Sequence, residues 1–349
     1  MITMLAAALA AQASVATAPA RVCIDPRTGY ANVDFILTNP TDKALAITEM
    51  RGLVFDAKGV VLERRLIWQD ALSATRPDSK IAARGKSVVF NALPFNNAAP
   101  GRRMRFEFDL DQPGSPSLAI DVTPVDCAAG QPRLILPITG RVLVYDGYDA
   151  LSHHRRSDFR GSLSDEMGIT GNFQRFGIDL VVVDREGRLW RGDGKRTSDW
   201  LGWGQPVRAA AAGTVAAMHD GQADNVVIGS VDKWGGPKKS DPMSSYGNYV
   251  LIDHGRGEFT LYGHLRQGSV RVKQGQPIMA GMTVGELGNS GASGGVHLHW
   301  ERRRGRGFGL TDIETQPIYV QDVQLVGGSN VRSPRIGLAI DTGDILLAR

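Results

Sequence analysis

The sequence has 349 residues, of which 42% are hydrophobic and 22% are charged, with a formal net charge of +4 at pH 7. This length allows two domains, and the nearly balanced charge gives no sign of a nucleic-acid-binding domain. Within the body of the chain, no apolar run is long enough to span a bilayer, so no integral membrane segment is predicted. Plentiful glycine and many short strand-like runs predict an all-β protein.

Residues 1–20 are predicted to be a secretory leader. They are uncharged, apolar and rich in small residues, and they end in Ala-x-Ala-like tripeptides between Ala16 and Ala20. This pattern is typical of a signal peptide, although the basic start is missing. A disordered alanine-rich leader is the alternative. The predicted location is therefore periplasmic or secreted.

Two cysteines, Cys23 and Cys127, bracket the segment that follows the leader. In an oxidising compartment they are predicted to form a disulfide. Closing a loop of about 100 residues stabilises a fold by roughly 4 to 5 kcal/mol in the chain-entropy model. Two unrelated buried thiols are the alternative.

Residues 21–130 are predicted to form an immunoglobulin-like β-sandwich. Strand-like runs alternate with turn signals, and Asp56–Gly59 is predicted to be a hairpin turn. The segment has no cluster of histidine, aspartate or glutamate with a chemical spacing, which favours a scaffold or docking role. Pro132 and Pro137 mark the boundary near residue 130.

Residues 131–328 are again rich in strand-like runs and hold all seven histidines of the chain. In the stretch GGVHLHWE, residues 294–301, apolar residues alternate with His297, His299 and Glu301, so one strand face carries two imidazoles and a carboxylate. Imidazole is a common zinc ligand, but a solvated strand face would show the same pattern. Residues 329–349 form a C-terminal tail that either docks on this domain or lies loose.

Four segments, in order, resemble the lysostaphin-like (LytM-type) zinc endopeptidases. They are FGIDLVVVD around Asp179, GQPVRAAAAGTV at 204–215, GNYVLIDHGRGEFTLYGHL at 247–265, and the glycine-rich hairpin with its His-x-His strand at 272–301. The resemblance covers somewhat over a third of the chain. It implies an antiparallel β-sheet peptidase domain that binds zinc and acts on bacterial peptidoglycan.

The resemblance also implies roles for individual residues. Asp179 and His299, the second histidine of His-x-His, correspond to metal ligands. His297 corresponds to a catalytic base that accepts a proton from water. His264 corresponds to a catalytic histidine that stabilises the developing oxyanion or helps to reprotonate the leaving amine.

One position departs from the family pattern. The family's first histidine ligand lies four residues before the aspartate, where this chain has Arg175. A guanidinium stays charged and has no lone pair, so it cannot bind zinc. His154, with His153 as its substitute, is predicted to supply the missing ligand from the preceding loop, and the chain resembles a subset of the family with a His-His-Arg-Arg segment. Two solvent-exposed surface histidines are the alternative.

The predicted function is zinc-dependent hydrolysis of peptide bonds in peptidoglycan cross-links or stems. The alternative, motivated by Arg175, is a catalytically degenerate LytM-like domain that binds cell wall or activates another murein hydrolase. A carrier or lectin-like module with aromatic loops would leave the ordered histidines unexplained. The predicted partner is a peptidoglycan peptide and not a nucleic acid, and the sequence predicts no oligomeric state.

Overall fold

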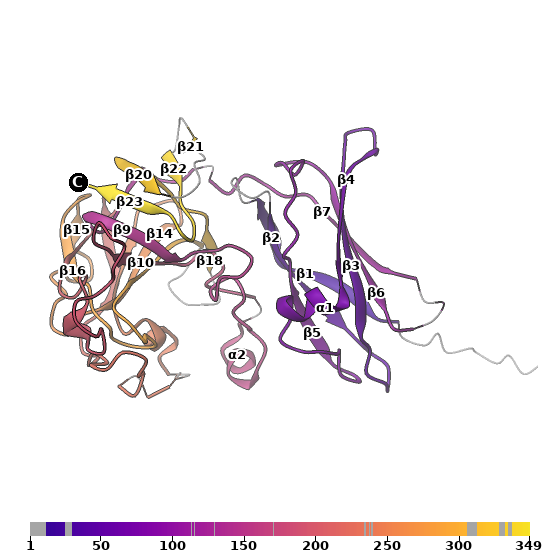
Figure 1. Ribbon diagram of the computed structural model, residues 1–349, viewed down its shortest axis with the longest axis horizontal. Helices are drawn as coiled ribbons and strands as arrows, with labels where there is room; N and C mark the ends of the chain where they lie inside the picture. The colour runs from indigo at the N-terminus through magenta and orange to yellow at the C-terminus, as the bar shows by residue number, and fades with distance from the viewer. Residues whose placement is uncertain are drawn as a thin grey trace, which may run out of the picture. The chain divides into compact units, whose positions relative to one another are not determined.

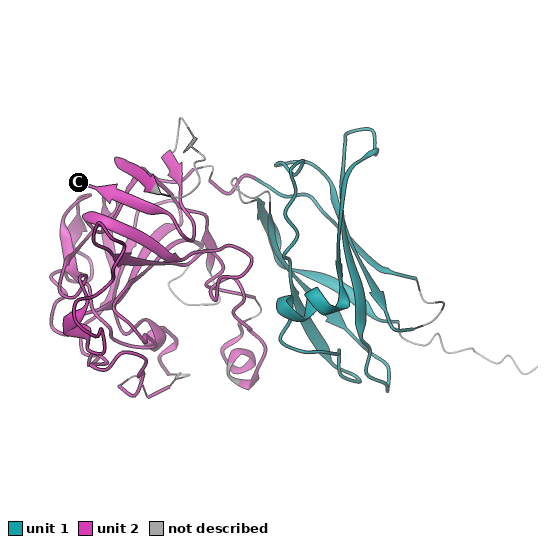
Figure 2. Cartoon of the chain, in the orientation of Figure 1, with its two compact units in different colours: residues 1–125 teal, residues 126–349 magenta. Residues whose placement is uncertain are grey.

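The computed structural model describes residues 12–24, 30–112, 114, 116–128, 130–169, 171–233, 235–236, 238, 240–305, 313–327, 332–333 and 337–349. The chain forms two compact units, residues 1–125 and residues 126–349 (Figure 2). The division falls a few residues before the boundary predicted near residue 130. Strands dominate both units, so the all-β prediction is confirmed (Figure 1).

Unit 1 consists of two antiparallel sheets with the strand orders β1-β2-β5 and β4-β3-β6-β7. Its elements are β1 (Ser14–Ile24), β2 (Ala31–Thr38), β3 (Ile47–Phe55), β4 (Val61–Trp68), α1 (Gln69–Leu72), the 3-10 turn Ser73–Thr75, β5 (Lys86–Phe90), β6 (Met104–Leu110) and β7 (Leu118–Val122). The predicted hairpin turn joins β3 to β4, where the carboxylate of Asp56 accepts the N–H groups of Lys58 and Val60 at 2.8 Å each.

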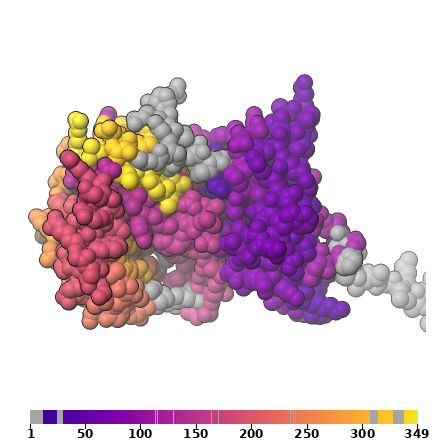
Figure 3. All heavy atoms as spheres, viewed as in Figure 1, coloured from indigo at the N-terminus to yellow at the C-terminus, as the bar shows by residue number. Residues whose placement is uncertain are grey.

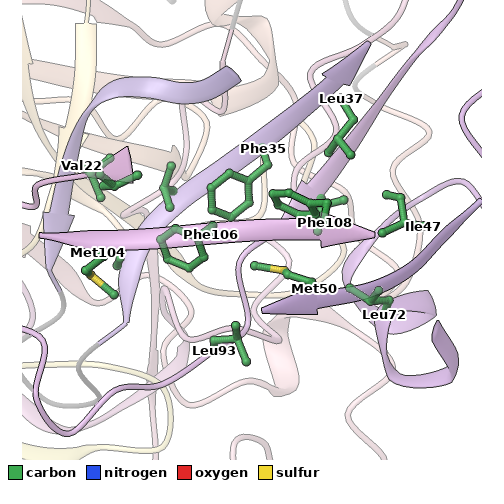
Figure 4. Close-up of a cluster of buried hydrophobic side chains, with 14 of the residues drawn as sticks. Val22, Phe35, Leu37, Ile47, Met50, Leu72, Leu93, Met104, Phe106 and Phe108 are labelled. Atoms are coloured by element: carbon green, nitrogen blue, oxygen red, sulfur yellow. The ribbon is translucent and has the colours of Figure 1, made fainter. Parts of the chain in front are cut away.

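Aromatic side chains from both sheets fill the space between them (Figure 4). The ring of Phe35 on β2 lies 4.7 Å from that of Phe106 and 5.0 Å from that of Phe108, both on β6. Met50 on β3 is fully buried in the same cluster. Apolar residues at every second position of a strand point to one face, which explains how these short strands enclose a common core.

Unit 1 is therefore a two-sheet sandwich, but its strand order differs from that of a constant-type immunoglobulin domain. In that type the fourth strand lies in the sheet of the first, second and fifth strands. Here β4 pairs with β3, from Glu49↔Trp68 to Phe55↔Val61, and so belongs to the other sheet. The immunoglobulin-like assignment stays a prediction.

Unit 2 is built around a ten-stranded sheet with the order β15-β12-β13-β14-β17-β10-β9-β23-β20, in which β18 also pairs with β17. Smaller sheets pair β11 with β16 and order β21-β22-β19-β8. The elements are β8 (Leu134–Ile135), β9 (Gly140–Asp146), α2 (Ser162–Met167), β10 (Ile178–Val182), the 3-10 turn Thr197–Asp199, β11 (Pro206–Arg208), β12 (Gly213–His219), the 3-10 turn Pro242–Tyr246, β13 (Asn248–Asp253), β14 (Glu258–Leu265), β15 (Pro277–Ile278), β16 (Thr283–Glu286), β17 (Leu298–Gly305), β18 (Ile313–Gln316), β19 (Tyr319–Gln321), β20 (Val323–Gly327), β21 (Arg332–Ser333), β22 (Gly337–Ala339) and β23 (Ile345–Ala348).

The C-terminal tail predicted for residues 329–349 belongs to unit 2 wherever the structure describes it. β23 pairs with β9 on one side and with β20 on the other, and β22 pairs with β19. Buried Leu346 and Ala348 alternate with more exposed neighbours, as expected of a strand with one covered face. Of the two possibilities for the tail, the docked one is therefore correct.

The predicted leader lies partly outside the described residues, which begin at residue 12. From Ser14 onward the chain belongs to β1, which pairs with β2 from Ser14↔Thr38 to Ile24↔Ala31. Residue 20 is thus inside a strand, and cleavage after it would remove Ser14–Ala20 from the sheet.

Cys23 and Cys127 are both disulfide-bonded, and no cysteine is free. Because the sequence has two cysteines, they pair with each other, which confirms the predicted disulfide.

Among the described helices, none combines the length and the hydrophobicity needed to cross a membrane.

Candidate metal centre

Two central strands of unit 2 place an aspartate beside a histidine. β10 and β17 are antiparallel, and their register sets Asp179 directly opposite His299. The two side chains point to the same face, where Nδ1 of His299 lies 3.2 Å from Oδ1 of Asp179. Both residues are buried. Pairing in the sheet thus brings together two predicted ligands that lie 120 positions apart in sequence.

A carboxylate on the same strand holds the other nitrogen of His299. Oε1 of Glu301 lies 2.6 Å from Nε2 of His299, and Oε2 accepts from Nε of Arg303 at 2.6 Å. Tyr246 donates its hydroxyl to Oε1 of Glu301 at 3.1 Å. This network fixes the ring of His299 with Nδ1 directed at Asp179, as carboxylates behind metal-bound histidines commonly do.

His153 and His154 belong to the loop that follows β9. Ser152 begins this turn by donating its hydroxyl to Oδ2 of Asp146 at 2.7 Å and to the carbonyl of Gly147. Buried Asn172 donates to the carbonyls of His154 and Arg155 at 2.7 and 3.0 Å. These bonds hold the loop against the sheet. His154, which is distant from β10 in sequence, therefore reaches the sheet face that carries Asp179 and His299.

The two loop histidines approach Asp179 with their Nε2 atoms. Nε2 of His154 lies 3.5 Å from Oδ1 of Asp179, and Nε2 of His153 lies 4.0 Å from Oδ2. The side chain of His154 is 2% exposed, whereas that of His153 is 67% exposed. Both residues therefore lie at the site, and the alternative of two surface histidines is wrong for His154.

Asp146, at the end of β9, lies behind the loop histidines. Its Oδ2 is 2.7 Å from Nδ1 of His153 and 3.2 Å from Nδ1 of His154. The geometry between Nδ1 of His154 and Oδ2 of Asp146 does not allow a hydrogen bond. Nδ1 of His154 is therefore a buried polar atom without a hydrogen-bond partner. Sequence reasoning missed Asp146, since a lone aspartate at a strand end carries no motif.

Burial and mutual contact shift the pKa values of these groups. Burial opposes ionisation of Asp179, but the imidazoles of His154, His297 and His299 outweigh it and hold the pKa of that carboxyl well below its ordinary value. Burial lowers the pKa of His154. Burial also acts against protonation of His299, yet its contacts with Asp179 and Glu301 raise its pKa to about 9.

These distances fit a bound cation. Three ring nitrogens surround Oδ1 of Asp179, from His299 at 3.2 Å, His297 at 3.4 Å and His154 at 3.5 Å. Ligand atoms held about 2.0 to 2.2 Å from a tetrahedral zinc lie roughly 3.3 to 3.6 Å apart. A nitrogen lone pair and a carboxylate oxygen repel each other unless a proton or a metal ion lies between them. The cluster could thus hold a proton or a metal ion between these atoms.

One group of donor atoms is close enough together to hold a metal ion. One atom each from Asp146, His153, His154 and Asp179 lies within 4.8 Å of the others, a group that leaves out His299. Nδ1 of His299 is nevertheless nearer to Asp179 than either of the loop Nε2 atoms. The short bond between Asp146 and His153 needs a shared proton, which favours Asp146 as a hydrogen-bond acceptor behind the site.

The two predicted catalytic histidines lie next to this cluster. Their rings are 4.7 Å apart, and the ring of His264 lies 5.8 Å from that of His299. His264 has a φ of +60°, a left-handed conformation that costs energy for a residue with a side chain. Burial, together with the charges of His297 and His299, holds its pKa well below the ordinary value.

The site opens into a cavity of about 560 Å³. The cavity is lined by all the histidines named above and by Trp190 and Trp200, whose rings lie 5.1 Å apart. Trp200 is fixed by a 3.0 Å bond from its indole N–H to the carbonyl of Gly194. Trp203, grouped with these tryptophans in the sequence, lines other hollows.

Close contacts explain why the residue after Arg175-Phe176 is a glycine. A side chain at Gly177 would place its Cβ only 3.0 Å from Cε1 of His299 and 3.1 Å from the carbonyl oxygen of Gln174. The position four residues before Asp179 is occupied by Arg175, which is buried. This part of the family pattern is therefore retained in its spacing but not in its ligand.

Comparison with known proteins gives a partial match. Residues 201–310 match the model described as Peptidase family M23. The peptidoglycan DD-endopeptidase ShyA of Vibrio cholerae is 46% identical over 55 residues, which cover 16% of this chain and 12% of ShyA. The murein hydrolase activator EnvC of Escherichia coli is 31% identical over 112 residues, which cover 32% of this chain and 23% of EnvC.

Among solved structures, the catalytic domain of the antimicrobial peptidase lysostaphin from Staphylococcus simulans is 19% identical, with 40% of this chain and 73% of that chain covered and a TM-score of 0.25. The chain thus spans less than a quarter of the length of ShyA and EnvC. The matched segment includes His264, His297 and His299, while Asp179 and the loop histidines precede it. Within unit 2, residues 201–310 are therefore similar to peptidase family M23.

Proposed function

We propose that this protein is a zinc-dependent endopeptidase that hydrolyses peptide bonds in bacterial peptidoglycan. The observation that carries the proposal is the convergence of His154 and His299, from a loop and a strand, on Asp179, with nitrogen–oxygen distances of 3.5 and 3.2 Å that suit ligands of one tetrahedral ion. Three protein ligands and an open position are the pattern of catalytic zinc. The match to family M23 and the names of the relatives support peptidoglycan as the substrate.

Between the two loop histidines, we assign the ligand to His154. Its Nε2 atom is nearer to Asp179 than that of His153, and its burial keeps it neutral. A neutral imidazole offers the lone pair that zinc needs. His153 is largely exposed and bonded to Asp146, which suits a residue at the rim of the cavity or a substitute ligand.

Zinc bound here would lower the pKa of its water to about 7 and polarise the scissile carbonyl. His297 suits the role of base. The carbonyl of Gly295 accepts from its Nδ1 at 2.8 Å, so the proton resides on that atom and Nε2 is free to accept another. Nε2 lies 3.4 Å from Oδ1 of Asp179, next to the three ligands. Water near the site would therefore lose its proton to Nε2 of His297.

The hydrogen bonds of His264 change the role expected for it. The carbonyl of Ser290 accepts from its Nδ1 at 2.7 Å, so a neutral His264 has a lone pair on Nε2 and accepts rather than donates there. Since its pKa lies well below the ordinary value, it is neutral at pH 7. His264 can stabilise an oxyanion or protonate an amine after it has gained a proton at Nε2. We therefore assign His264 the transfer of this proton from its Nε2 to the leaving amine.

A catalytically silent relative is the second candidate. Arg175 stands where the family has a ligand, and one relative, EnvC, is named an activator of murein hydrolases. This reading predicts no stable zinc. The survival of both catalytic histidines, together with a buried replacement ligand, favours the enzyme. A periplasmic or secreted location belongs to the proposal, supported by the disulfide and by the substrates that the relatives' names give.

Metal analysis and peptidoglycan digestion test the proposal together. We expect one zinc per chain, cleavage of purified peptidoglycan, and loss of cleavage on adding a chelator with recovery on adding zinc. The His154→Ala variant should bind zinc much more weakly and lose activity, whereas His153→Ala should retain the wild-type affinity for zinc. His219→Ala is the matched control, since His219 is exposed and stacks on Tyr249 away from the site. A wild-type protein that binds no zinc and cleaves no peptidoglycan would contradict the proposed enzyme and favour the catalytically silent relative.

A further inference from the structure

The end of the chain contacts the strand and loop that position His153 and His154. β23 pairs with β9 from Ile345↔Leu143 to Ala348↔Gly140, and the loop with the two histidines begins where β9 ends (Figure 1). The C-terminal residues, coloured yellow in Figure 3, lie on the surface of unit 2. They follow the segment matched to family M23, which ends at residue 310.

A compact turn, Asp341–Asp344, precedes β23. The backbone N–H of Asp341 donates to Oδ2 of Asp344 at 3.0 Å, and the N–H of Asp344 donates to the carbonyl of Asp341 at 3.2 Å. Val144 of β9 donates its N–H to the carbonyl of Asp344 and accepts that of Gly343, each at 2.9 Å. Both aspartates are buried, whereas Thr342 and Gly343 between them are exposed, so the turn is held against β9 at the rim of the sheet by these backbone bonds.

This turn also accepts the first two amides of the histidine loop. Oδ1 of Asp341 accepts the N–H of Tyr148 at 2.9 Å, and the hydroxyl oxygen of Thr342 accepts the N–H of Gly147 at 2.9 Å. The fit is close, because a Cβ on Gly147 would lie 2.3 Å from Oδ1 of Asp341. The ring of Tyr148, in turn, packs 5.1 Å from that of Phe176, ahead of β10.

The path from this turn to the ligand is short. The carbonyl of Gly147 accepts the hydroxyl of Ser152, which also bonds Asp146, and Asp146 in turn bonds His153 and lies beside His154. Without Asp341 the buried amide of Tyr148 would lose its acceptor, a loss that favours a different path for the loop. A zinc ligand displaced by a fraction of an ångström no longer fits the other two.

We propose that Asp341 and Thr342 are positioning residues for the relocated metal ligand His154. The proposal rests on the proposed function in that it takes His154 to bind zinc. Arg175, ahead of β10, stands where the family pattern has a histidine, and the proposed substitute comes from a loop that the turn at Asp341–Asp344 holds in place. The affinity for zinc then depends on the turn at Asp341–Asp344, which contains no metal ligand itself.

Competition with a chromophoric chelator measures the affinity of the full chain for zinc. We expect Asp341→Ala and Thr342→Val to weaken zinc binding by roughly 10- to 100-fold, the usual effect of residues behind a metal ligand. Asp341→Asn keeps an acceptor oxygen and should restore most of the affinity. Ser269→Ala is the control, because it removes a hydroxyl from unit 2 that bonds Arg266 and Glu286 and not the histidine loop. Affinities of Asp341→Ala and Thr342→Val equal to that of Ser269→Ala would overturn the proposal.

A thermodynamic cycle tests the route through His154. In a His154→Ala background, adding Asp341→Ala should weaken zinc binding no further, whereas equal losses in both backgrounds would contradict the proposal. Hydrogen exchange of the zinc-free protein gives a second readout, which can be measured even if the wild type or a variant binds no zinc. Asp341→Ala should speed exchange in residues 147–156 and leave β13 unchanged. If wild type binds no zinc, the proposed function fails, while unchanged exchange in 147–156 refutes the positioning role by itself.

Discussion

Among the described residues, the two units differ in how many charged side chains they bury: unit 1 buries Asp34, Glu49 and Arg76, and unit 2 buries a larger set. The core of unit 1 is an apolar cluster around Phe35 and Phe106, and its main charge network lies on the outer sheet face. Unit 2 buries charges beside its cavity, among them Asp179, Glu301 and Arg303. A buried ion costs several kcal/mol unless partners compensate it, so stability alone gives no reason to gather them there. The contrast indicates a scaffold in one unit and chemistry in the other.

The main charge network of unit 1 is more exposed to solvent than that of unit 2. Arg51 contacts Glu49, Glu107 and Asp109 at 2.5 to 3.0 Å. The side chain of Asp109 is 36% exposed, whereas that of Glu301 is 0% exposed. Exposed pairs contribute little because water and salt screen them, while removing one member of a buried pair strands the other. The predictions below examine this difference, beginning with the largest effect.

Replacing His297 should separate the chemistry of unit 2 from its stability. His297→Ala is expected to slow peptidoglycan cleavage by about 10²- to 10⁴-fold, the usual contribution of a general base, and to leave zinc bound. Soluble fragments released per unit time, with zinc analysis of the same sample, check both points. A loss of zinc in this variant would make His297 a ligand and not a base.

Glu301→Gln should destabilise unit 2 by about 3 to 5 kcal/mol, since it leaves the buried Arg303 without its anion. In the native protein Arg303 and His299 hold the pKa of Glu301 at about 2 against the effect of burial. Urea denaturation followed by hydrogen exchange in β14 and β17 gives the change. Glu107→Gln in unit 1 is the matched comparison, with an expected effect below about 1 kcal/mol. Equal effects would remove the distinction between the units.

Met50→Ala should destabilise unit 1 by about 2 to 5 kcal/mol through the cavity left beside Phe106 and Phe108. Because the cluster that contains Met50 belongs to unit 1, zinc content and peptidoglycan cleavage at 25 °C should stay at the wild-type level. Exchange rates in β3 and β6, measured beside zinc analysis, test this independence. A fall in zinc content would show that the scaffold also supports the metal site.

The smallest effect is expected in acid. Hydrogen bonds from Arg51 lower the pKa of Asp109 below its ordinary value. A depressed pKa contributes stability that is fully present above the unfolded-state pKa, about 3.9, and is lost as the pH falls through the folded-state value. Asp109→Asn should therefore lower the stability of unit 1 slightly at pH 7 and not at all below the folded-state pKa. A difference that grows toward low pH would reverse the assigned sign.

Part of the site could be predicted from sequence because Asp179 and His299 sit in strand-like segments. Alternation in residues 296–301 placed His299 on one strand face, and ordered motifs linked it to Asp179 and His264. The supporting residues could not be found this way. Asp146 and Asp341 are single aspartates after unremarkable runs, and their roles come from contacts with distant backbone amides and imidazoles. The docked tail and the position of β4 likewise depend on which strand edges meet.

The sequence by itself determined the β character and the disulfide partners, and it predicted a division near residue 130 and the histidine and aspartate positions of the proposed site. It did so because strand periodicity, cysteine count and side-chain chemistry are local properties. Only the tertiary structure decided that His154 is buried against Asp179 while His153 faces solvent, and that the end of the chain supports their loop. Metal ligands are selected by where donor atoms converge in space, and the spacing along the chain does not restrict that convergence.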